Sequence, residues 1–142
     1  MKKSLYMNIL VPIDGSEYSQ KALLQACEIA KNYKSNLILV YVVDKPISLN
    51  LLDRKEYLNI LRKFGEKVLV KGKQNAKLAG IDATTIMKEG NISNEIVKIA
   101  KTKKCNLIII GSKGLGTAAR FFLGSVSNKL ATISPCSILI VK

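Results

Sequence analysis

Two uninterrupted apolar runs, within segments 36–43 and 106–110, constrain the fold more than any other feature of the sequence. They read N-L-I-L-V-Y-V-V and N-L-I-I-I. Their β-branched residues favour strands, and a strand that is apolar at successive rather than alternate positions must be covered on both faces. The sequence therefore predicts a sheet that lies between two layers of helices.

Strand and helix patterns alternate along the chain. We expect strands at 6–12, 36–43, 82–88, 106–110 and Ser137–Val141, and helices at 17–34, 53–78, 93–103 and 125–132. This alternation is typical of a doubly wound, mostly parallel sheet. The predicted fold class is α/β, with a five-stranded sheet and helices on both faces.

The first two predicted helices carry different local signals. Ser16 can cap the helix at 17–34, and Glu17 lies at the positive end of its dipole. The pattern at 53–78 contains Gly65 and Gly72, and a glycine inside a helix costs about 1 kcal/mol relative to alanine. We therefore expect a bend or an interruption in the second helix.

Composition favours one small domain. The chain has 142 residues, of which 48% are hydrophobic. This length suffices for one hydrophobic core but is too short for two, so we treat 1–142 as a single domain. No apolar run approaches the roughly 20 residues that cross a bilayer. Asn8, Pro12 and Asp14 interrupt the first segment before the core of a signal peptide can form. We expect a cytoplasmic protein without a membrane partner.

The side chains that usually support metal and nucleophile chemistry are scarce. Histidine is absent, which excludes Ser-His and Cys-His nucleophile pairs. Cys27, Cys105 and Cys136 are widely spaced and form no C-x-x-C pair. We expect three buried, reduced thiols and assign neither catalytic nor metal-ligating residues.

The charge of the chain favours anionic partners. Lys and Arg number 23 and Asp and Glu 10, which gives a formal net charge of +13, and no acidic residue follows Glu95. Charge alone does not choose among a nucleotide, nucleic acid and a membrane surface. Nearly all of the excess is lysine, which reads phosphates and base edges less well than arginine, so we do not expect nucleic acid as the partner. Nucleic-acid binding is the alternative. It predicts strongly salt-dependent affinity that disappears when Lys101, Lys103 and Lys104 are removed.

Segment 111–127 is the most informative part of the sequence. It reads G-S-K-G-L-G-T-A-A-R-F-F-L-G-S-V-S and follows the most apolar predicted strand. Its glycines allow positive φ and let backbone N–H groups approach an oxyanion closely. Gly124 and Ser125 also open the next predicted helix, whose first N–H groups lack partners and whose dipole favours negative charge. We expect this segment to bind phosphate; the alternative is a flexible turn in which Ser125 only caps the helix.

Two better-known phosphate motifs match this segment incompletely. Gly111 and Gly116 have the spacing of a P-loop, but the lysine that should follow the second glycine is missing. Gly114, Gly116 and Ala119 match the dinucleotide fingerprint, but in the last predicted strand–helix unit and without a downstream acid for a ribose. We therefore reject both assignments.

The glycine segment has the spacing G-x2-G-x9-G-[ST], with Gly111, Gly114, Gly124 and Ser125 at the fixed positions. Other matching stretches are V-Y-V-V-D at the end of the second strand, M-N-I-L-V-P-I-D-G-S-E from Met7, E-G-N-I-S-N-E-I-V-K-I-A from Glu89 and S-P-C-S-I-L-I-V near the end. In these features, which cover essentially the whole chain, the sequence resembles the universal stress protein family, and specifically its ATP-binding branch.

The resemblance implies a fold, a ligand and a site. The fold is a Rossmann-like sandwich of the adenine nucleotide alpha hydrolase-like type that dimerises and holds ATP, or ADP or AMP, with Mg²⁺ able to accompany the phosphates. Pro12 and Asp14 would border the nucleoside, and the main chain of Val42 would meet adenine. The residues that would surround the ribose and phosphates are Gly111, Gly114, Gly124, Ser125 and Val126.

Some positions leave alternatives open. Asn106 and Lys113 depart from the family pattern, in which an acid and an arginine or histidine are common. Lys113 could reach a phosphate or be solvated, and Asp14 could instead be a turn or capping residue. Tyr18 and Tyr41 could be pocket walls, but we expect them to serve packing.

We predict a regulatory stress-response protein that senses an adenine nucleotide as a homodimer. One alternative is a slow ATPase, for which Asp14 would be the available base. Another is a dimeric stress protein of the same fold that binds no nucleotide. The apolar segment Ser137–Val141 could form a sheet edge that pairs with its copy in a second subunit.

Overall fold

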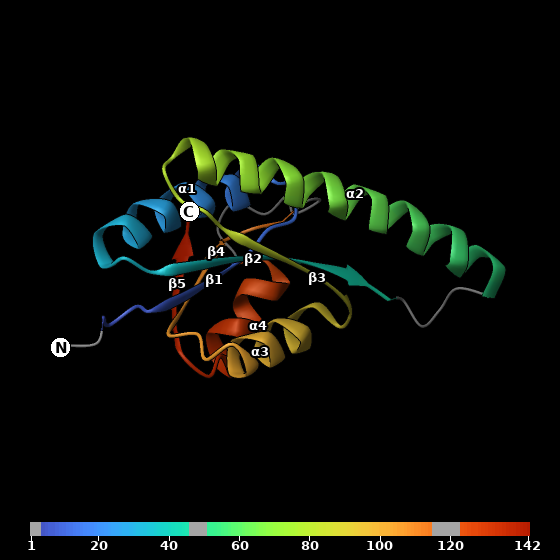
Figure 1. Cartoon of the computed structure of the whole chain (residues 1–142). Coiled ribbons are helices and arrows are strands. Elements are labelled where there is room, and N and C mark those ends of the chain that lie inside the picture. The colour runs from blue at the N-terminus through green and yellow to red at the C-terminus, as the bar shows by residue number, and fades with distance from the viewer. Residues whose placement is uncertain (1–3, 46–50, 115–122) are drawn as a thin grey trace.

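Parallel strands form the centre of the molecule (Figure 1). The structure is a computed structural model that describes residues 4–45, 51–114 and 123–142. Its strands are β1 (Asn8–Pro12), β2 (Asn36–Asp44), β3 (Thr84–Gly90), β4 (Leu107–Gly111) and β5 (Ser137–Val141). Its helices are α1 (Glu17–Tyr33), α2 (Leu51–Leu78), α3 (Ile92–Thr102) and α4 (Ser125–Ile133).

The described strands make one five-stranded, all-parallel sheet in the order β3-β2-β1-β4-β5. Helices α1 and α2 cover one face, and α3 and α4 cover the other (Figure 1). The predicted α/β class, strand number and three-layer arrangement are confirmed. All observed boundaries lie within two residues of the predicted ones.

Both faces of the central strands are buried, as the apolar runs predict. Alternate residues of β2 join separate cores: Leu39 and Tyr41 pack with α1 and α2, whereas Val40 and Val42 pack with α3 and α4. Every residue of β4 is buried. The edge strands β3 and β5 are less covered, since most of their residues are half-buried or exposed.

The expected interruption of the second helix was wrong, because α2 runs without a break through Gly65 and Gly72. A Cβ at Gly65 would overlap the ring of Tyr41, and one at Gly72 would lie 2.8 Å from Ile13 Cδ1. The two glycines therefore let α2 lie close against the sheet. This tertiary packing outweighs their local helix cost of about 1 kcal/mol each.

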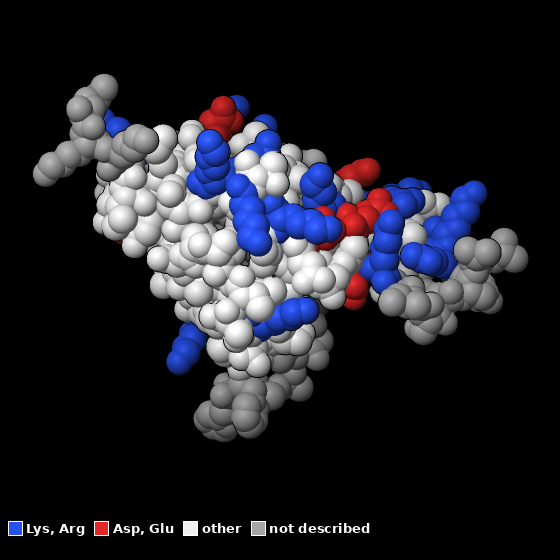
Figure 2. Space-filling model, turned by 90° about the horizontal axis from the view of Figure 1, so that it is seen from below, with Lys and Arg blue, Asp and Glu red and all other residues white. Residues whose placement is uncertain are grey.

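The burial expected for the thiols holds for two of the three cysteines. All three thiols are free, and Cys27 and Cys105 are buried, but Cys136 is only half-buried because it precedes the edge strand β5. Figure 2 views the side that carries α3 and α4, and shows far more blue basic side chains than red acidic ones. No helix in the described part of the chain is both long and apolar enough to cross a membrane.

Candidate functional site

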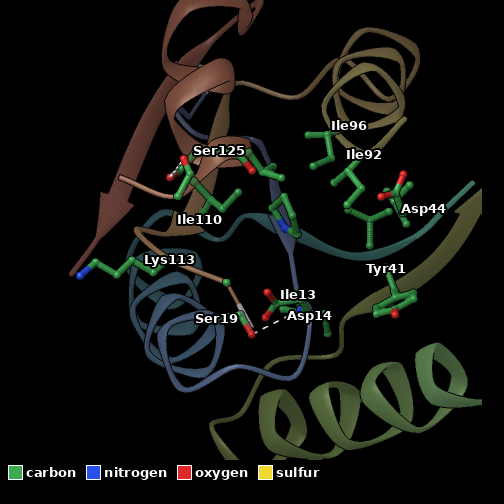
Figure 3. Close-up of a pocket in the computed structure, with 18 of the residues that line it drawn as sticks. Ile13, Asp14, Ser19, Tyr41, Asp44, Ile92, Ile96, Ile110, Lys113 and Ser125 are labelled. Carbon is green, nitrogen blue, oxygen red and sulfur yellow. Dashed lines mark hydrogen bonds between the residues drawn. The ribbon is translucent and has the colours of Figure 1, made fainter. Parts of the chain in front are cut away.

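A pocket of about 320 Å³ lies at the carboxyl ends of the central strands (Figure 3). The strand order reverses at β1, because β2 and β3 follow on one side of it and β4 and β5 on the other. The connections leave for opposite faces there, so a crevice forms between the ends of β1 and β4, the usual ligand position in open α/β sheets.

All eight residues predicted for the site line this pocket. They are Pro12, Asp14, Val42, Gly111, Gly114, Gly124, Ser125 and Val126. They come from four separate segments that only the fold brings together. Lys113 also lines the pocket, but its side chain leans toward Tyr18, with Nζ 6.0 Å from the ring centroid.

The end of β2 offers main-chain groups to the pocket. The pairing of β1 with β2 ends at Pro12 and Val40, after which the N–H of Ile13 donates to the carbonyl of Val40 at 2.9 Å. Main-chain groups two residues apart in a strand point to the same side. The main-chain N–H and carbonyl groups of Val42 therefore point to the side of β2 on which β1 has already ended. They can bond to a flat ligand that has a donor and an acceptor atom side by side.

Asp14 forms the next part of the wall. Its Oδ1 accepts a hydrogen bond from the backbone N–H of Ser16 at 2.8 Å. A Cβ at Gly114 would lie 2.6 Å from its Oδ2, so the carboxylate lies directly beside the glycine segment. The N-cap of α1 is Ser16, not Asp14. Asp14 thus stabilises the turn and still faces the pocket.

None of the three predicted site glycines, Gly111, Gly114 and Gly124, has a positive φ. Their lack of a side chain instead lets neighbouring protein atoms lie close to the backbone. A Cβ at Gly111 would lie 2.7 Å from the main-chain carbon of Tyr18, so this glycine lets α1 pack on β4. One at Gly124 would lie 3.3 Å from Ser112 O. Gly116 and Ala119 lie outside the described residues.

Helix α4 begins at the pocket without a side-chain cap. Its N-cap is Gly124, which provides no capping side chain, and its first turn contains no acid. Ser127 Oγ donates to Ser112 O at 2.9 Å and to Gly124 O at 3.0 Å, so this hydroxyl bonds to carbonyl groups and is not the N-cap of α4. The first N–H groups and the exposed Ser125 hydroxyl are placed to bind an anion.

The family model described as the universal stress protein family matches residues 5–142. The chain belongs to this family.

Its relatives and structural neighbours match it over most of their length. Universal stress protein YxiE of Bacillus subtilis is 34% identical, over 97% of this chain and 100% of that protein. Universal stress protein UspA from Lactobacillus plantarum is 25% identical with a TM-score of 0.88, over 96% of this chain and 98% of that chain. A universal stress protein solved in complex with cAMP is 28% identical with a TM-score of 0.77, over 98% and 99% of the chains.

This universal stress protein also has pocket walls that the sequence did not reveal. Tyr57 and Leu61 come from α2, and Ile92 and Ile96 from the start of α3. Together with Val126, which also lines the pocket, their side chains give the pocket an apolar part. The only local signal was helical periodicity, which predicts a buried face but not which cavity that face lines.

An ion pair fastens the α2 wall to the sheet. Arg62 donates to both carboxylate oxygens of Glu89, from Nε at 2.8 Å and from Nη2 at 2.7 Å. This hydrogen bonding lowers the pKa of Glu89 and raises that of Arg62. Lys45 Nζ lies 3.8 Å from the same carboxylate. The contact joins α2 to the end of β3, beside the start of α3.

Tyr41 of this universal stress protein was predicted to serve packing rather than to line the pocket. It does pack, against Gly65 and edge-on to Phe64 at 6.0 Å between ring centroids, but it also lines the pocket. Burial raises the pKa of Tyr41, and the negative charge of Asp14 raises it further. Its hydroxyl therefore stays protonated at neutral pH and is available as a donor.

Proposed function

We propose that the chain binds an adenine nucleotide in this pocket as a regulatory ligand, with ATP as the principal candidate and ADP or AMP as alternatives. The observation that carries the proposal is that β1, β2, the glycine segment and the open start of α4 line the same cavity. The family neighbour solved with cAMP supports an adenine nucleotide as the ligand.

The chemistry of the walls orients the nucleotide. Adenine fits between the apolar side chains, with its polar edge at the main chain of Val42. Pro12 and Asp14 border the nucleoside. The phosphates face Gly111, Gly114 and the first turn of α4, all of which line the pocket. Hydrogen bonds to a charged group contribute roughly 1.5–3 kcal/mol each, so a few of them support micromolar affinity.

Mg²⁺ is compatible with this arrangement but is not held by the protein alone. The described residues contain no cluster of three or more acidic or cysteine side chains that could hold a metal ion. Asp14 is the carboxylate beside the glycine segment. We propose that Mg²⁺, when present, is bound mainly by phosphate oxygens and water, with Asp14 as the nearest protein ligand.

We propose a sensor rather than an efficient hydrolase. Asp14, the carboxylate nearest the expected phosphates, already accepts the hydrogen bond from Ser16 N–H. The signal would pass through a homodimer in the cytoplasm. Strand β5 is an edge of the sheet that pairs only with β4 in the described chain, which leaves its other side for a second copy.

The binding proposal is tested by mass spectrometry of small molecules released from the denatured protein and by calorimetric titration with ATP, ADP, AMP and cAMP. Gly124→Val places a branched side chain at the start of α4, where even its Cβ would lie 3.3 Å from Ser112 O. We expect it to weaken ATP binding by more than about tenfold, a loss of ~1.4 kcal/mol, without unfolding the chain.

Ala131→Val is the matched control, because Ala131 is exposed on the same helix and does not line the pocket. It should leave the affinity unchanged. If no adenine nucleotide is released and ATP gives no binding heat up to ~1 mM, the proposal is wrong. If the affinity survives Gly124→Val, the phosphates bind elsewhere.

A further inference from the structure

A second hollow, of about 260 Å³, is lined by residues of α1, of α2 and of the turn that follows β1. These two helices cover the face of the sheet away from α3 and α4 (Figure 1). Ile13 and Ser19 line both this hollow and the nucleotide pocket, and the other residues around it are different. The turn that follows β1 therefore separates two cavities. None of the eight residues predicted for the nucleotide site lines this second hollow.

The floor of the second hollow is apolar. It is formed by Ile13, Leu23, Val68 and the ring of Phe64. Phe64 is 40% exposed, so part of its ring is accessible to solvent. A ligand that covered this ring would remove apolar surface from water, and that is favourable by roughly 25 cal/mol per Å².

The opening at Gly15 depends on the absence of a side chain. Gly15 has a φ of +87°, and a Cβ there would lie 3.2 Å from both Phe64 Cζ and Val68 Cγ2. Any larger residue would be strained and would crowd the floor. Glycine at this position therefore keeps this side of the hollow open without backbone strain.

The rim is basic. Lys67 and Lys71 lie one turn apart on α2 and are exposed, and the amides of Gln20 and Asn75 lie beside them. Among the described residues, no carboxylate lies within 4.0 Å of either ammonium group, whereas Lys21, Lys45 and Lys98 each have an acidic neighbour. The hollow therefore presents positive charge and amide donors above an apolar floor.

From this combination, we propose that the hollow between α1 and α2 is a second binding site, which takes a small organic anion with a carboxylate head and an apolar body. The head would meet Lys67 and Lys71, and the body would cover Phe64 and Val68. A polyphosphate has no apolar part for the floor, and a divalent cation would find no carboxylate among the lining residues.

The test is a titration of the ¹⁵N-labelled protein with sodium octanoate, followed by amide chemical shifts. We expect saturable shifts at residues of α1 and α2 around the hollow. Lys67→Gln/Lys71→Gln should weaken octanoate binding about tenfold, because both charged donors are lost. Lys63→Gln/Lys73→Gln is the matched control, since these lysines are exposed on α2 but do not line the hollow, and it should change little.

Two further titrations distinguish this site from nonspecific apolar binding and from the nucleotide pocket. Octanol has the same chain without the charge and should bind much more weakly; equal binding would overturn the assignment of an anionic ligand. Saturating ATP should not displace octanoate, and displacement would place octanoate in the nucleotide pocket. The absence of saturable shifts up to ~10 mM octanoate would also overturn the proposal, whether or not ATP binds.

Discussion

Helices α1 and α4 both begin at the carboxyl edge of the sheet, and their first turns are nearly alike. Each has a serine three residues after its N-cap, and that hydroxyl donates to the N-cap carbonyl: Ser19 to Ser16 O at 3.1 Å, and Ser127 to Gly124 O at 3.0 Å. The helices differ at the cap itself. Ser16 Oγ accepts from Ser19 N–H at 3.2 Å, whereas Gly124 has no side chain with which to accept.

The first-turn charges follow the same division. Helix α1 carries Glu17, and α3, which is capped by Asn91 at 3.0 Å, carries Glu95. Helix α4 has no first-turn acid. In a parallel sheet every crossover helix starts at the ligand edge, so each start is a potential anion site. In α1 and α3 a side-chain cap and a first-turn acid occupy the helix N-terminus, which we call a closed start. The N-terminus of α4 has neither, and we call it an open start; it lies at the pocket.

The largest expected effect comes from closing the open start. Ser125→Asp puts a carboxylate in the first turn of α4, where two unit charges roughly 5 Å apart repel by about 3 kcal/mol at an effective dielectric constant of ~20. We expect ATP affinity to fall about 100-fold in calorimetry. Thermal stability should hold or rise, because an acid at a helix start contributes about 0.3–1 kcal/mol.

Asn94→Asp is the control for that change. Asn94 lies in the first turn of α3, is exposed and does not line the pocket, so the same added charge should leave affinity close to the wild-type value. Equal losses in both variants would mean that net charge, and not the start of α4, governs binding.

A smaller effect is expected where the glycine segment approaches the open helix start. Gly114→Ala places a methyl group 2.6 Å from Asp14 Oδ2, so the carboxylate, which lines the pocket, must shift. We expect about tenfold weaker ATP binding with little loss of stability, since a side-chain end can move at modest cost. Calorimetry and thermal melting measure the two effects.

Gly111→Ala is the informative partner of this variant. Its methyl group would meet the main chain of Tyr18 at 2.7 Å, which cannot move without displacing α1. This variant should therefore lose folding stability, by about 1–3 kcal/mol. If Gly111→Ala proved stable and Gly114→Ala did not, the separation of packing from ligand approach would be wrong.

The sheet could be predicted well from the sequence because its signals are local. The runs in β2 and β4 and the cap at Ser16 each depend on a few neighbouring residues. The glycine pattern likewise selected residues that line one pocket. Positive φ was an incomplete reason for that pattern, because close approach explains Gly111, Gly114 and Gly124.

The α2 side of the pocket could not be predicted, because it depends on contacts between distant segments. Gly65 and Gly72 resemble helix breakers in sequence, and only the fold shows that they make room for Tyr41 and Ile13. For the same reason Tyr57 was not recognised as a wall of the pocket. Helix propensity is a weak prior that such packing overrides.

The smallest expected effect comes from opening the closed start. Ser16→Ala removes the side-chain cap of α1 but keeps the backbone N–H that donates to Asp14 Oδ1. Loss of a serine cap costs about 1 kcal/mol, so urea unfolding should show a decrease of that size. ATP affinity should change by less than about twofold, because α1 would gain an unsatisfied donor without gaining a place at the phosphates. Ser16→Asp, which retains a capping oxygen, should restore the stability. A loss of affinity in Ser16→Ala comparable to that in Ser125→Asp would show that both helix starts contribute to binding, and the division between a closed and an open start would not hold.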